Sequence, residues 1–294
     1  MSLHPSFDPE ALTANAPGAA LAPGLYIVAT PIGNLMDISA RALLVLARAS
    51  LIACEDTRVT GKLLNHFGIK TRMLPYHDHN AARARPGLIA RALGEPVALV
   101  SDAGTPLISD PGYKLVTEAR AAGVNVVAVP GASAVIAALS IAGLPTDRFL
   151  FAGFLPVKEK AKAVVIAELA AVPATLAFYE SGPRLAVTLA ALHAGLGDRP
   201  AAVGRELTKK FEEMVTGPLS VLAARWADAP PKGEIVVLVG PPLLAPAATA
   251  EDLDSALRGA LATMRVKDAA KAVAERLGLP RTDVYARALV LKDG

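Results

Sequence analysis

The sequence predicts an α/β fold made of two α/β domains and a small helical domain at the C-terminus. Short apolar runs that end in Gly, Pro, Asp or Ser alternate with Ala-rich stretches of helical character, which is the pattern of strands and crossover helices. The chain has 294 residues, of which 53% are hydrophobic, so it can fill more than one core. A proline-rich segment at residues 241–248 is interpreted as a linker.

The first α/β domain is expected at residues 24–138, after a flexible leader at residues 1–23. Its strands are predicted at residues 25–29, 51–54, 73–76, 96–100 and 124–129. Helices are predicted at residues 39–49, 59–67 and 134–142, with Ser39 as the cap of the first. The strand at 96–100 is almost entirely apolar, as central strands of parallel sheets are.

The second α/β domain is expected at residues 139–242, with strands at 150–154, 174–179, 201–204 and 234–239. A helical tail is predicted at residues 250–294, with helices at 254–264, 267–277 and 282–291. Residues 258–294 hold eight Lys or Arg against four Asp or Glu. This excess of positive charge indicates either weak affinity for nucleic acid or a solvated helix face.

Amino-acid composition limits the cellular location and the kinds of metal or disulfide site that this chain can have. Cys54 is the only cysteine, which excludes a disulfide framework and a zinc site with several thiolates from one chain. A reducing, cytoplasmic location is therefore predicted. The first 24 residues contain no Lys or Arg, unlike a signal peptide. Residues 124–145 are uncharged, but Pro130-Gly131 interrupts them, so a strand and a buried helix are expected rather than a membrane span.

Two loops after predicted strands are suited to ligand binding. Residues 101–112 contain two Asp, two Pro and two Gly directly after a buried strand, where α/β folds bind ligands. Asp102 and Asp110 can accept hydrogen bonds, and Gly104 permits close backbone approach; a pair of capped turns is the alternative. In the second loop, 130–133, small residues either expose amides to a carboxylate or form a plain helix cap.

Charged side chains follow other predicted strands. Glu55, Asp56 and Arg58 come after the strand at 51–54 and either pair with one another or face a polar substrate. Residues 180–184 are expected to form a charged turn after a strand of the second domain, so that two strand ends enclose a cleft. His77 and His79 alone make a weak metal motif, and no metal site is predicted. The charge run at 204–213 is typical of an exposed β-turn-helix.

Six segments in order carry a resemblance to a known family. They are residues 29–35 (ATPIGNL), 54–58 (CEDTR), 101–112 (SDAGTPLISDPG), 130–133 (PGAS), 153–156 (GFLP) and 205–209 (RELTK). Together they resemble the tetrapyrrole methylase superfamily, specifically its ribosomal RNA small-subunit methyltransferase I branch. The resemblance runs from about residue 25 to the C-terminus.

The resemblance implies a two-domain class III methyltransferase fold that binds S-adenosylmethionine between its domains. The implied reaction is 2'-O-methylation of a cytidine ribose in 16S ribosomal RNA within the small subunit, by a homodimer without membrane attachment. Residues expected to contact the cofactor are Pro31, Asp102, Ala103, Gly104, Thr105, Asp110, Pro130, Gly131, Ala132 and Ser133. Expected catalytic residues are Glu55, Asp56 and Arg58, with a carboxylate as general base; expected substrate contacts are His77, Asn80, Arg205, Lys209 and Lys210.

Two other functions remain open at this stage. Methylation of a small tetrapyrrole ring would use the same cofactor cleft, although the segment at 54–58 and the basic tail favour RNA. A non-catalytic RNA-binding assembly factor would keep the fold without the cofactor, although the intact loops at 101–112 and 130–133 argue against it.

Overall fold

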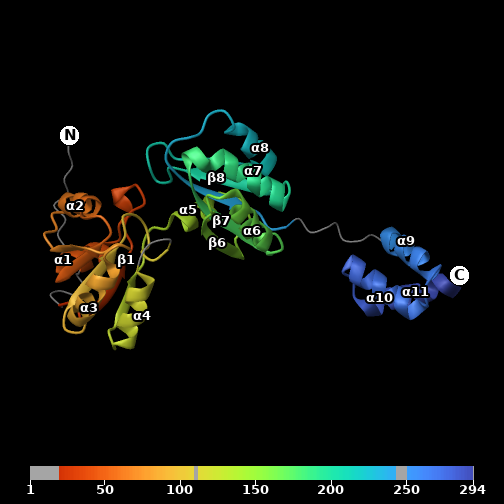
Figure 1. Cartoon of the computed structure of the whole chain (residues 1–294), viewed down its shortest axis with the longest axis horizontal. Helices are drawn as coiled ribbons and strands as arrows, with labels where there is room; N and C mark the ends of the chain where they lie inside the picture. Colours follow the sequence, from red (N-terminus) through yellow and green to blue (C-terminus); the bar gives the residue numbers. More distant parts are fainter. Residues whose placement is uncertain (1–19, 109–111, 243–249, 294) are drawn as a thin grey trace. The chain divides into compact units, whose positions relative to one another are not determined.

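The structure is a computed structural model that describes residues 20–108, 112–242 and 250–293. These residues fall into two compact units that divide after Pro242. The first unit contains two sheets with their helices, and the second contains three helices (Figure 1). The predicted α/β class with a small C-terminal helical part is therefore confirmed. Most of the predicted leader, and Asp110 of the predicted cofactor loop, lie outside the described residues.

The first sheet has the strand order β3-β2-β4-β1-β5, and every neighbouring pair is parallel. Its strands are β1 (Gly24–Val28), β2 (Leu51–Cys54), β3 (Met73–Pro75), β4 (Pro96–Val100) and β5 (Val126–Val129). All five lie within or one residue outside the predicted ranges. The order places the carboxyl ends of β4, β1 and β5 side by side.

Helices cover both faces of this sheet because its strands are apolar on both sides. On one face, Leu46 of α1 (Ala40–Arg48) and Leu64 of α2 (Thr57–His66) pack against Ile52 and Val100. The other face is covered by α3 (Ala81–Ala92) and α4 (Tyr113–Ala121), whose buried residues join the same core as Leu25, Val97 and Leu99. Ser39 caps α1 as predicted, since its hydroxyl accepts from the amide of Ala42.

The second sheet is mixed, with the order β6-β7-β10-β8-β9. Strands β6 and β7 are parallel, whereas the remaining neighbours are antiparallel. The strands are β6 (Phe149–Phe154), β7 (Thr175–Ser181), β8 (Pro200–Arg205), β9 (Glu213–Pro218) and β10 (Glu234–Val239). The predicted β-turn-helix at 204–213 is wrong: the charge run is a turn between two paired strands, because Glu213 pairs with Arg205 across the ladder.

The two faces of the second sheet have different partners. Phe178 and Val237 lie on the face covered by α6 (Glu159–Leu169), α7 (Leu185–Leu196) and α8 (Leu219–Arg225). The opposite face, with Ala177 and Val236, packs against α5 (Ala134–Ile141) and against Ile32 from the first domain. Since side chains alternate along a strand, this second face presents Tyr179 and Glu234 toward the first domain.

Glu180 does not belong to a charged turn, contrary to the sequence prediction. Strand β7 continues through Ser181, and the Glu180 side chain is fully buried on the α7 face. Its carboxylate accepts a hydrogen bond of 2.6 Å from the Thr188 hydroxyl and pairs with Arg184 at 3.3 Å. The hydrogen bond and the pair satisfy this buried carboxyl group, so Glu180 belongs to the interior of the second domain.

The second unit consists of α9 (Ala250–Leu261), α10 (Val266–Leu277) and α11 (Arg281–Asp293) around a core of their own. Leu257, Val273 and Val284 are buried in it. Helix α10 ends at Gly278, whose left-handed backbone makes the predicted sharp turn into α11. Across the described ranges, the helices are too short or too polar to cross a membrane.

Candidate functional site

Three loops at the carboxyl edge of the first sheet are joined by hydrogen bonds. Thr30, after β1, donates its amide to the Gly104 carbonyl at 2.9 Å, and Gly104, after β4, donates back at 3.0 Å. The Thr105 hydroxyl donates to the Ala132 carbonyl in the loop after β5 at 3.1 Å. From β1 the chain continues to β2 on one side, and from β4 it continues to β5 on the other side. Open α/β sheets bind ligands at the carboxyl ends of strands where the connections change direction in this way.

Glycine is required at two points of this junction. Gly104 has φ of +76°, a conformation that L-residues rarely adopt. Gly131 lies so close to β1 that an added Cβ would stand 2.9 Å from the Ala29 Cβ. At Gly104 and Gly131 the loops therefore leave backbone with no side chain of its own.

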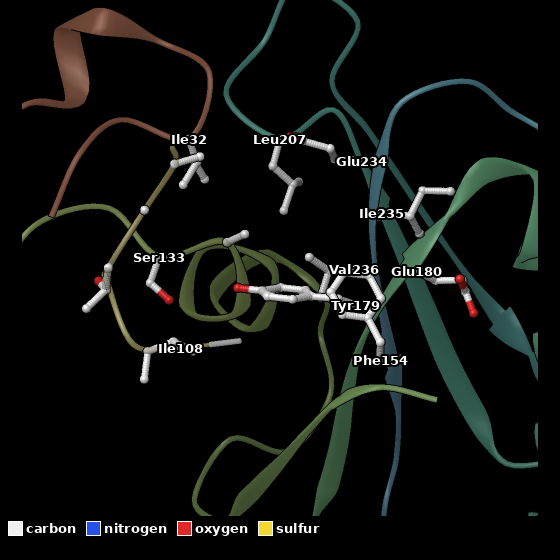
Figure 2. Close-up of a pocket in the computed structure, with 14 residues that line it drawn as sticks. Ile32, Ile108, Ser133, Phe154, Tyr179, Glu180, Leu207, Glu234, Ile235 and Val236 are labelled. Carbon is white, nitrogen blue, oxygen red and sulfur yellow. The ribbon is translucent and has the colours of Figure 1, made fainter. Parts of the chain in front are cut away.

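A cavity of about 220 Å³ lies between these loops and the second sheet (Figure 2). Its wall from the first domain consists of Ile32, Ala103, Gly104, Thr105, Ile108, Ser133 and Ala134. Its wall from the second domain consists of Phe154, Tyr179, Glu180, Leu207, Glu234, Ile235 and Val236. In Figure 2 the Tyr179 ring extends toward the side of Ser133 and Ile108, whereas the Glu180 carboxylate points away.

The second-domain wall is aromatic. The Tyr179 ring lies 4.8 Å from the Phe151 ring and 5.6 Å from the Phe154 ring, measured between centroids. Gly153, with φ of +67°, allows the irregular pairing that brings Phe154 opposite Tyr179. A cavity with aromatic side chains on one wall and exposed loop backbone on the other suits a flat ring that carries polar groups.

A second pocket, of about 320 Å³, adjoins the cavity and is lined by more ionisable side chains. It shares Ile32, Ala103 and Glu234 with the cavity. Its polar lining comes from Thr30, Thr60, Lys62, Ser101, Asp102, Lys209 and Glu234. Of the loop after β4, Asp102 lines only this acceptor pocket, as we call it below, Ala103 lines both pockets, and Gly104 and Thr105 line only the cavity.

Lys209 links the two domains at the acceptor pocket. Its Nζ donates to Glu206 at 2.9 Å and to Glu234 at 2.8 Å. Burial alone would lower the pKa of Lys209, but the hydrogen bonds to both carboxylates outweigh burial and raise it. The Lys209 stem lies against Gly33, where an added Cβ would stand 2.3 Å from Cγ. This charge is already compensated, so Lys209 is poorly suited to bind a phosphate.

The turn that carries Lys209 is strained. Glu206 and Thr208 both have positive φ, of 48° and 66°, which is unfavourable for residues with a side chain. The turn is held by the Glu206 amide, which donates to the Glu234 carbonyl at 3.0 Å, and by the Glu234 amide, which donates to the Glu206 carboxylate at 3.0 Å. Such strain is concentrated at functional sites.

Asp56 and Arg58 bind each other at the edge of the site. Asp56 accepts from the Arg58 amide at 2.8 Å as the cap of α2, and pairs with its guanidinium at 2.6 Å. The Asp56 amide donates to Asp102 at 3.0 Å, so this segment is tied to the β4 loop. Asp56, Arg58 and Glu55 line neither pocket. The predicted alternative of mutual pairing is what the structure shows for Asp56 and Arg58.

The remaining predicted substrate residues lie in different places. Asn80 accepts from the His77 amide at 3.0 Å and thereby forms the turn before α3. Arg205 lies on the α8 face of the second sheet, paired with Glu213 at 3.1 Å, and Lys210 is exposed beside Phe211. The His77 and His79 rings are 5.9 Å apart. Within the described part of the chain, no three His, Cys, Asp or Glu residues are grouped to hold a metal ion.

Sequence reasoning missed the second-domain wall. Tyr179, Phe154, Leu207 and Glu234 were not predicted as site residues. The strand predicted at 234–239 could have indicated Glu234, because side chains two residues apart in a strand share a face, which places this carboxylate beside Val236.

Comparisons with known proteins agree with this arrangement. Residues 24–223 match the Tetrapyrrole (Corrin/Porphyrin) Methylases family, and residues 247–292 match the RsmI C-terminal HTH domain. A Mesorhizobium japonicum protein named ribosomal RNA small subunit methyltransferase I is 54% identical over 280 residues, covering 94% of this chain and 95% of that protein. The Escherichia coli O157:H7 protein of the same name is 46% identical over 274 residues, covering 90% and 94%.

Solved structures share the fold at low identity. A diphthine synthase has a TM-score of 0.59 at 19% identity, covering 74% of this chain and 89% of that one. A uroporphyrin-III C-methyl transferase from Thermus thermophilus, complexed with S-adenyl homocysteine, has a TM-score of 0.51 at 20% identity, covering 74% and 97%. These likenesses concern the fold alone, and they confirm the predicted tetrapyrrole methylase-like architecture of the two sheets.

The ion pair at the edge of the site predicts a titration. The hydrogen bond from the Arg58 side chain is the main cause that lowers the pKa of Asp56 to about 2. Because the charged form is favoured in the folded state, this contribution to stability is present above the unfolded pKa of about 3.9 and is lost as the pH falls toward 2. We expect Arg58→Ala to raise the Asp56 pKa in a carboxyl NMR titration.

Asp198 serves as the internal control, because its pKa is lowered by hydrogen bonds from Ser220 in the second domain. It should titrate unchanged in the Arg58→Ala variant. An Asp56 pKa that stays near 2 in this variant would contradict the assigned cause.

Proposed function

The chain belongs to the tetrapyrrole methylase family and to its ribosomal RNA small-subunit methyltransferase I branch, and we propose on this premise that it methylates small-subunit ribosomal RNA with S-adenosylmethionine. In its finer form the proposal places the methyl group on the 2'-oxygen of a cytidine in 16S ribosomal RNA. The observation that carries it is the similarity to proteins of that name across both units of the chain.

The cavity fits this cofactor by the chemistry of its walls. Tyr179 and Phe154 offer aromatic faces to a purine ring, while Gly104 leaves loop backbone open to the polar groups of the ligand. When bound, S-adenosylmethionine supplies a methyl group activated by its sulfonium. The residues proposed to hold it are Ala103, Gly104, Thr105 and Ser133, which line the cavity, together with their loop neighbours Pro31, Asp102, Pro130, Gly131 and Ala132. Asp110 is proposed by sequence alone.

RNA is proposed to approach from the edge where α2 begins. The Arg58 side chain is 86% exposed, and its guanidinium can bind a phosphate while Asp56 orients it. Glu55, His77 and Asn80 follow the neighbouring strands β2 and β3 and are proposed to border the RNA. Lys210 would extend the contact on the second domain, whereas Arg205, which pairs with Glu213 behind the sheet, is proposed by sequence alone. The excess of Lys and Arg in residues 258–294 supports a further RNA contact there.

The setting of the reaction is also part of the proposal. We infer a homodimer that acts in the cytoplasm on ribosomal RNA within the small subunit. The family membership supports this setting, and the match of residues 247–292 to a helix-turn-helix domain supports a nucleic-acid substrate.

The reaction can be tested directly by transfer of a labelled methyl group. Small ribosomal subunits from cells that lack this enzyme should accept one methyl group from labelled S-adenosylmethionine, and nuclease mapping should place it on one cytidine ribose. Subunits from cells that contain the enzyme are the control and should accept none. Label on a small tetrapyrrole, with none on RNA, would contradict the proposed substrate.

Cofactor binding can be tested at Gly104. An alanine there would place its Cβ 3.2 Å from Ile32 on the cavity wall, in addition to the strain of a positive φ. We expect Gly104→Ala to weaken calorimetric affinity for S-adenosylhomocysteine by about tenfold or more, which is about 1.4 kcal/mol. Gly123→Ala is the matched control, because Gly123 has φ of +81° with nothing near its added Cβ. Equal affinities in the two variants would refute the cavity as the cofactor site.

A further inference from the structure

We propose that the acceptor pocket binds the ribose that is methylated and that Glu234, positioned by Lys209, accepts the proton of its hydroxyl group. This inference rests on the proposed function, since it assumes an alcohol acceptor and an adjacent methyl donor. It assigns a role to a carboxylate that the sequence motifs did not single out.

Glu234 lies where the two pockets meet. Among the residues that line the cavity, Ile32, Ala103 and Glu234 also line the acceptor pocket, and only Glu234 among these three has a side chain that can accept a proton. A general base must reach the hydroxyl whose oxygen attacks the methyl group. A carboxylate at the junction of the donor and acceptor spaces meets that requirement, whereas Glu55 and Asp56 line neither space.

The acceptor pocket is lined by ammonium and hydroxyl groups. Lys62 and Lys209 supply ammonium groups, and Thr60 and Ser101 supply hydroxyls. In RNA the 2'-hydroxyl stands next to the 3'-phosphate, so a ribose pocket needs hydrogen-bonding groups together with a cation. Lys62 is exposed on α2 and can serve the phosphate.

Lys209 acts as a positioning residue. Its ammonium donates 2.8 Å to Glu234 Oε2 and 2.9 Å to Glu206, and its stem is confined against Gly33. The Glu234 side chain is 75% exposed and would otherwise sample several rotamers. Lys209 therefore holds the carboxylate at the edge of the acceptor pocket, beside the loop of the first domain that contains Gly33.

As the 2'-oxygen forms its bond to the methyl carbon, the carbon–sulfur bond breaks and its electron pair remains on sulfur. The hydroxyl proton passes to a Glu234 carboxylate oxygen. The carboxylate becomes neutral as the sulfonium charge disappears, and the proton is later released to water.

Asp102 is the competing carboxylate in the same pocket. Its Oδ1 accepts the Asp56 amide at 3.0 Å, and it lines the acceptor pocket without reaching the cavity. Replacement of each carboxylate by its amide should therefore affect a different property, either cofactor affinity or turnover. Asp102→Asn is expected to lower cofactor affinity through the loop, whereas Glu234→Gln is expected to lower only turnover.

The test uses the full-length protein, small subunits as acceptor and S-adenosylhomocysteine as the binding probe. We expect Glu234→Gln to lower kcat by roughly 100-fold or more, the usual effect of a lost general base, with calorimetric affinity and KM changed less than about threefold. Glu234→Asp should recover part of kcat. Glu168→Gln, an exposed carboxylate variant on α6, is the matched control and should behave as the wild type.

Lys209 is tested by two substitutions. Lys209→Met keeps the apolar stem on Gly33 but removes the charge, and should lower kcat with unchanged cofactor affinity; Lys209→Arg should restore much of it. The inference is overturned if Glu234→Gln keeps kcat within about threefold of wild type, or if it loses cofactor affinity in a folded protein. Failure of the proposed function is distinct, because the wild-type protein would then bind the probe without labelling RNA.

Discussion

The site depends on the pair of backbone hydrogen bonds between Thr30 and Gly104. These bonds join the loop after β1 to the loop after β4. The Thr30 hydroxyl also donates to the Ser101 carbonyl at 3.4 Å, across 71 residues of sequence. They hold Ile32 in the cavity wall and fix the backbone of Gly104 beside it. Because β4, β1 and β5 are adjacent in the sheet, one junction organises all three loops.

The second sheet completes the site through the alternation of its side chains. Tyr179 and Glu234 face the first domain, whereas Glu180 and Arg205 face the helices behind the sheet and stabilise it through ion pairs. The strained turn at Glu206–Thr208 brings Leu207 into the cavity wall and Lys209 to Glu234. The parallel sheet thus supplies the three joined loops, and the mixed sheet supplies the opposite wall with the Glu234 carboxylate at its edge.

Most of the strands could be predicted from local sequence patterns. The elements that could not be predicted depend on contacts between residues far apart in the sequence. The apolar run at 96–100 and the cap at Ser39 carry their structure in adjacent residues. The strand β9 was missed because its residues pair with β8 only after a turn held by Glu206 and Glu212. Glu180 looked like a turn residue because its partner Thr188 lies on a helix that sequence alone cannot place. The loops at 101–112 and 130–133 were recognisable, whereas the Tyr179 wall required the fold.

The central claim is that S-adenosylmethionine lies between the three joined loops and the second sheet. Hydrogen exchange of the full chain, measured with and without saturating S-adenosylhomocysteine, tests it most directly. The account predicts slower exchange at residues 30–34, 101–108 and 130–134 together with residues 234–236. Protection confined to the helices of residues 250–293, or absent from the three loops, would contradict it.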